Sequence, residues 1–103
     1  MPGYKRLQRL AHHLEEAERR QATQPRCALC PARRHVGEAV AACRAGQRVS
    51  AAYHCLQAMG FGLYQRCGLP DAIQDIAAEV IDACIQAGDR VPLSEGELAF
   101  SRT

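Results

Sequence analysis

A chain of 103 residues with 48% hydrophobic residues has the size and apolar content of one globular domain, which excludes a disordered tail. Its net charge is only +2, and no apolar run approaches the roughly 20 residues that a membrane-spanning helix needs. The charge is nevertheless uneven, because residues 1–48 hold ten Lys or Arg against four acids, whereas residues 49–103 hold three against seven.

Residues 4–22 predict an amphipathic helix. Tyr4, Leu7, Ala11 and Leu14 recur at steps of three and four, and charged side chains occupy the other faces. The same charges fall where a secretory signal would be apolar. We therefore expect a cytoplasmic protein with no membrane partner.

The linker that follows contains the chain's CxxC pair, Cys27 and Cys30, in a segment interrupted by prolines. Two thiolates at this spacing can occupy two corners of a tetrahedral zinc site, and His35 on the next predicted helix could supply a third. A lone CxxC is also typical of loop thiols without a metal, and it occurs in redox dithiols, although the βαβ setting of a thioredoxin-like site is missing here. These interpretations stay open. The candidates for a fourth ligand are Cys43, His54, Cys55 and the adjacent His12 and His13.

A reducing compartment keeps thiols reduced, so we interpret the other cysteines mainly as packing residues. Cys43, Cys67 and Cys84 fall on the apolar stripes of predicted helices, where cysteine behaves as a small hydrophobe. Cys55 adjoins His54, but adjacent helical side chains point about 100° apart. The two are therefore not expected to act as nucleophile and base.

Two helices are predicted in the middle of the chain. The helix over 32–45 ends where Gly46 provides a C-terminal glycine. A helix over 49–67 carries an apolar stripe that runs through Leu63 to Cys67, and Gly68 follows it. Its weak point is the pair of glycines in the sequence Gly-Phe-Gly at positions 60–62, where it could kink, split or approach another helix closely.

The helix over 70–87 has the clearest pattern. Pro70 suits its first turn, Gly88 closes it, and a broad stripe of β-branched residues predicts a place at the centre of the core. The tail over 89–103 contains a capping-box pattern before Phe100, which suggests a short helical turn that folds back or docks on a partner.

No segment alternates as a strand would, so the predicted fold class is all-α: a compact antiparallel bundle of about four helices with a short C-terminal tail, forming one domain over 1–103. The core is rich in alanine and contains no tryptophan, and small side chains bury little area each. A second copy of the chain could complete such a core, so a homodimer is a candidate state.

The unequal charge distribution indicates two candidate docking surfaces for a partner. The basic one surrounds the CxxC pair and comprises Arg26, Arg33, Arg34, Arg44 and Arg48. The acidic one lies along one face of the last predicted helix, with Phe100 as a separate apolar anchor, and comprises Asp75, Glu79 and Asp82. Solvated faces that happen to segregate would give the same pattern.

The sequence contains none of the phosphate-binding, nucleophile-elbow, dinucleotide or HExxH metalloprotease motifs, so we do not expect an enzyme. The first hypothesis is a small interaction module, such as a regulator, adaptor or inhibitor, that binds another protein. The alternative is a zinc-stabilised protein that contacts nucleic acid through the basic region around residues 26–48.

Overall fold

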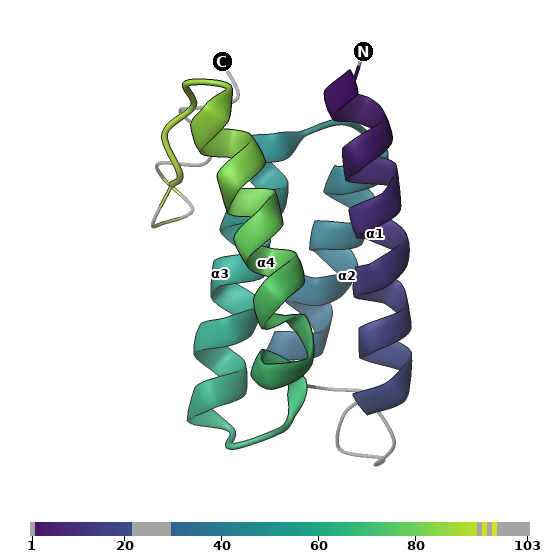
Figure 1. The fold of residues 1–103 in the computed structure, drawn as a ribbon. Coiled ribbons are helices and arrows are strands. Elements are labelled where there is room, and N and C mark those ends of the chain that lie inside the picture. Colours follow the sequence, from purple (N-terminus) through teal and green to yellow (C-terminus); the bar gives the residue numbers. More distant parts are fainter. Residues whose placement is uncertain (1, 22–29, 93, 95, 97–103) are drawn as a thin grey trace.

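The computed structural model describes residues 2–21, 30–92, 94 and 96, with side chains from Lys5 onward. Four helices make up the described part, and they run in alternating directions (Figure 1): α1 (Pro2–Gln21), α2 (Pro31–Arg44), α3 (Arg48–Tyr64) and α4 (Leu69–Gln86). Each helix packs on the next, and α1 also packs on α4, so the helices close into a bundle. The predicted all-α antiparallel bundle is confirmed.

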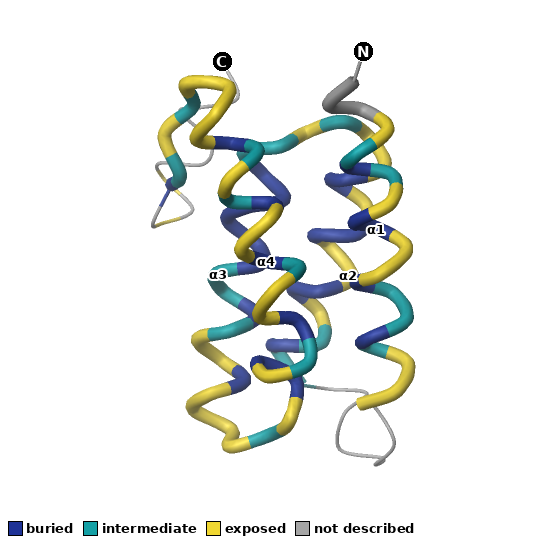
Figure 2. The backbone as a smooth tube through the Cα atoms, viewed as in Figure 1, coloured by how far each residue is buried: buried dark blue, intermediate teal, exposed yellow. Residues whose placement is uncertain are grey.

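The core of the bundle is built from a few large aliphatic side chains set among alanines. Leu10 and Leu14 from α1, Val36 from α2, and Ile73 and Val80 from α4 are all 0% exposed. Full burial of each such side chain contributes roughly 1.5–3 kcal/mol before the entropic cost. Figure 2 shows buried positions recurring along α1, α2 and α4, as their spacing in the sequence predicts.

The first half of α3 is buried on all sides. Residues 50–55 are all buried. An amphipathic helix at the corner of a bundle would instead expose one face to solvent. The chain after α4 returns toward this helix, because Arg48 Nε donates a hydrogen bond to Asp89 Oδ2 at 2.8 Å and Pro92 is fully buried. The segment after α4 therefore contacts the start of α3 through Asp89 and is buried again at Pro92.

Three helices end with the same hydrogen-bonded reversal, in which one residue adopts a left-handed conformation. Gly46 after α2 and Gly88 after α4 have φ values of 73° and 80°, as the glycine positions predict. After α3 the left-handed residue is Arg66, with φ 55°, and Cys67 N–H donates to the Gly62 carbonyl at 3.1 Å. Helix α3 consequently ends at Tyr64, earlier than the predicted 67.

The two glycines of α3 have different roles. The helix runs through both without a break. A Cβ atom built on Gly62 would lie 2.6 Å and 2.7 Å from Cγ and Cδ of the buried Pro70 ring, whereas one on Gly60 would meet no atom within 4 Å. The sequence left open a kink, a split or a close approach of another helix at these glycines. The structure shows the close approach, and it occurs at Gly62.

Candidate functional site

Two buried histidines meet between α2 and α3. His35 and His54 are each 7% exposed, and their Nδ1 atoms lie 2.9 Å apart. Their ring centroids are 5.2 Å apart. This is close to the largest centroid separation that the 2.9 Å contact between the nitrogens permits, so the two Nδ1 atoms point almost directly at each other. One Nδ1 therefore carries the proton and donates it, and the other accepts.

The surroundings of this histidine pair connect it to the surface. His54 Nε2 lies 3.4 Å from Glu38 Oε2, and Tyr53 presents its ring edge-on to both imidazoles. The Phe61 ring is parallel to the His35 ring within 7°, with centroids 5.6 Å apart. Phe61 thus contacts the buried His35 ring while 36% of its own surface remains exposed.

The predicted zinc site is only partly brought together. His35 meets His54, one of the candidates for a fourth ligand, whereas Cys30 is half-buried immediately before α2 and Cys27 lies outside the described residues. Within the described ranges, no three or more His, Cys, Asp or Glu side chains form a group that could hold a metal. Zinc binding stays a prediction.

Large apolar side chains are exposed together at the end of α3. Leu63 is 67% exposed, Tyr64 is 83% exposed and Phe61 is 36% exposed, all within about one helical turn. We call Phe61, Leu63 and Tyr64 the α3 tip. The predicted stripe placed Leu63 on the inner face, but Gly62 is the residue that faces Pro70 at this level, so Leu63 and Tyr64 are directed outward.

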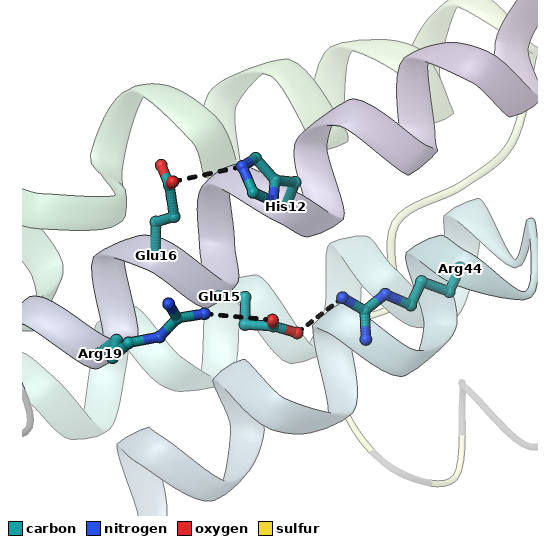
Figure 3. A network of polar contacts seen from close by, with 5 residues as sticks. All are labelled: His12, Glu15, Glu16, Arg19 and Arg44. Carbon is teal, nitrogen blue, oxygen red and sulfur yellow. Dashed lines mark hydrogen bonds and ion pairs between the residues drawn. The ribbon is translucent and has the colours of Figure 1, made fainter.

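The arginines of the predicted basic surface are largely paired with carboxylates. Figure 3 shows Glu15 accepting from both Arg19 and Arg44, the latter at 2.7 Å, beside a separate contact between His12 and Glu16. Arg33 pairs with Glu18 at 3.0 Å, and Arg48 pairs with Asp89 at 2.8 Å. Arg34 is exposed beside an open groove, and Arg26 lies outside the described residues.

The acidic surface of α4 is more open. Asp75 and Glu79 are exposed on the outer side of the helix, and Asp82 accepts from Arg6 at 3.3 Å. The proposed anchor Phe100 lies outside the described residues. Because the Arg6–Asp82 contact joins a basic part of the sequence to an acidic one, the charge segregation along the chain is partly cancelled in space.

An open groove of about 470 Å³ runs along α2 and the start of α3. Its walls include Arg34, Gly37, Glu38 and Ala41 from α2, Ala45 directly after α2, and His54 from α3. The α2 residues at its centre are glycine and alanine, whose small side chains leave this space open. Sequence reasoning did not identify this groove, although glycine and alanine at positions 37, 41 and 45 could have indicated it.

The buried thiols lack the properties of a catalytic nucleophile. Burial raises the pKa of Cys43 to about 11, and burial together with repulsion from Cys43 raises the pKa of Cys55 to about 12. Both side chains are 0% exposed and lie in the core, as is Cys84. Nucleophilic cysteines need a lowered pKa and access to substrate, so none of these three is suited to covalent catalysis.

No protein-family model, curated protein or solved structure matches the chain, so its function is inferred from its own geometry. In the described ranges, each helix is too short or too polar to cross a lipid bilayer.

Proposed function

We propose that this chain is a small non-enzymatic helical module that acts by binding another protein through the α3 tip. The proposal rests on the exposure of three apolar side chains, Phe61, Leu63 and Tyr64, within about one helical turn. Aromatic side chains with one accessible face are enriched at the centres of protein interfaces, where they contribute much of the binding energy.

The packing beneath the α3 tip supports this role. Phe61 is stacked on the buried His35 ring, and Gly62 packs against the Pro70 ring, so the backbone beneath the tip is packed on both sides. A surface that is ordered before binding avoids much of the entropic cost of association. The tip therefore combines exposed apolar area with a preformed shape.

Charge has a secondary role in this proposal. Asp75 and Glu79 are exposed on α4 and would steer a partner with a basic rim, which is a contribution to association rate more than to affinity. The alternative function, a zinc-stabilised protein that contacts nucleic acid, has less support. Arg33, Arg44 and Arg48 already contact carboxylates, which leaves fewer cations to neutralise phosphates.

The test compares two variants that place acids on exposed apolar positions. The double variant Leu63→Glu, Tyr64→Glu changes the tip, and Ile85→Glu changes a side chain on α4 that is 60% exposed. Both should keep their unfolding free energies within roughly 0.5 kcal/mol of the wild type, because all three positions are exposed. Immobilised wild type and variants are then compared by quantitative mass spectrometry of the proteins they retain.

We expect at least one protein to be retained by the wild type and by Ile85→Glu and to be lost with the tip variant. Equal retention by all three would refute a role for the tip. In that case, reversal of charge at Asp75 and Glu79 tests the acidic surface of α4 instead. Binding of duplex DNA or RNA that weakens steeply with salt would favour the alternative function.

A further inference from the structure

The outer face of α2 is a separate surface that the α3 tip does not use. Its exposed residues form one arc on the helix, centred on Ala41: Arg34, Gly37, Glu38, Ala41, Arg44 and Ala45. The face is open, because a Cβ atom built on Gly37 would meet no atom within 4 Å and the groove of about 470 Å³ runs along it. A second helix could therefore approach α2 closely here.

The residues on this face are arranged symmetrically about Ala41. Four positions before and after Ala41 stand the small residues Gly37 and Ala45, and three positions before and after stand the opposite charges of Glu38 and Arg44. In an antiparallel pair of helices related by a two-fold axis at Ala41, residues equally far from the axis lie at the same level. Small residues then meet small residues, and each acid meets a base.

We propose that α2 is a homodimer interface, in which α2 packs antiparallel on α2 of a second copy around a two-fold axis at Ala41. Glu38 of each copy lies across the seam from Arg44 of the other, within reach of the two side chains. Arg44 already contacts Glu15 Oε2 at 2.7 Å, but a guanidinium has five N–H donors and can contact a second carboxylate. Two reciprocal ion pairs thus flank a centre of small residues.

This charge arrangement favours a second copy of the chain over another protein as the partner on this face. A helix of another protein could also fit a shallow groove, but the reciprocal positions of Glu38 and Arg44 match those of an identical helix. The outer face of α4 shows the contrast, because Asp71, Asp75 and Glu79 would repel their counterparts in an antiparallel self-pair.

The first experiment places one cysteine at the proposed axis. Ala41→Cys should form an intermolecular disulfide under mild oxidation, because residues on a two-fold axis bring their own counterparts within disulfide distance. The control Ala78→Cys replaces an exposed alanine on α4, and unmodified protein reports cross-linking by native thiols. Cross-linking of Ala78→Cys to the same extent as Ala41→Cys would overturn the proposal.

The second experiment reverses the charges and measures dimerisation by sedimentation equilibrium. Glu38→Arg should weaken dimerisation by about tenfold or more, because two attractive contacts become repulsive. Mixing Glu38→Arg with Arg44→Glu should restore a heterodimer, since each acid again faces a base. A wild type that stays monomeric at about 100 μM, or a mixture that does not associate, would refute the interface. The double tip variant should dimerise normally, so failure of this proposal and of the proposed function can be told apart.

Discussion

The sharpest prediction concerns the two glycines of α3. Replacing Gly60 by alanine should stabilise the protein by about 0.5–1 kcal/mol, because alanine loses less backbone entropy in a helix and the added Cβ meets no atom within 4 Å. Gly62→Ala gains the same propensity, but its Cβ would lie 2.6 Å from Cγ of the buried Pro70 ring. Overpacking of this kind typically costs about 1–3 kcal/mol. Because the propensity gain is common to both variants, their difference isolates the clash and should equal about 1–3 kcal/mol.

The assay is urea unfolding followed by helical circular dichroism, with the wild type and both variants compared at equal slope m. A domain of this size is expected to unfold in one cooperative transition. The combined variant Gly62→Ala, Pro70→Ala removes the ring and should recover most of the loss, relative to Pro70→Ala alone. If Gly62→Ala were as stable as Gly60→Ala, α4 would not approach α3 as closely as the structure shows.

Three further predictions test the core, the helix ends and the thiols. Ile73→Ala should lower the unfolding free energy by about 2–5 kcal/mol in urea titrations, whereas the exposed Ile85→Ala should change it by less than about 0.5 kcal/mol. Arg66→Gly should stabilise by about 1 kcal/mol in the same titrations, since Arg66 holds φ 55°, and a neutral or negative effect would argue against the left-handed turn. Burial and the nearby Cys43 raise the pKa of Cys55 from 9.0 to about 12. The protonated thiol's contribution to the unfolding free energy is therefore fully present below pH 9 and is lost as the pH rises from 9 toward 12. Alkylation of Cys55 by iodoacetamide, read by peptide mass spectrometry at pH 8, should be negligible without urea, and rapid labelling of the folded protein would contradict its burial.

The candidate site was less accessible to sequence reasoning than the fold. Helical periodicity placed His35 and His54 on neighbouring helices but could not show that their Nδ1 atoms meet, because that depends on the rotation of α2 against α3. The periodic stripe of α3 also continued to Leu63, although this side chain is 67% exposed. The reason is local: Pro70 packs on Gly62, and the helix ends sooner than Gly68 suggests.

The sequence by itself determined the helices, the antiparallel order that short connections impose, and the glycine ends of α2 and α4. These features depend on local spacing and backbone preference, which are written in neighbouring residues. Only the tertiary structure decided which arginines are paired, which glycine is a contact, and which apolar side chains remain exposed. Those properties depend on residues far apart in the chain, such as Arg6 with Asp82 and Arg48 with Asp89, and packing fixes them only when the helices come together.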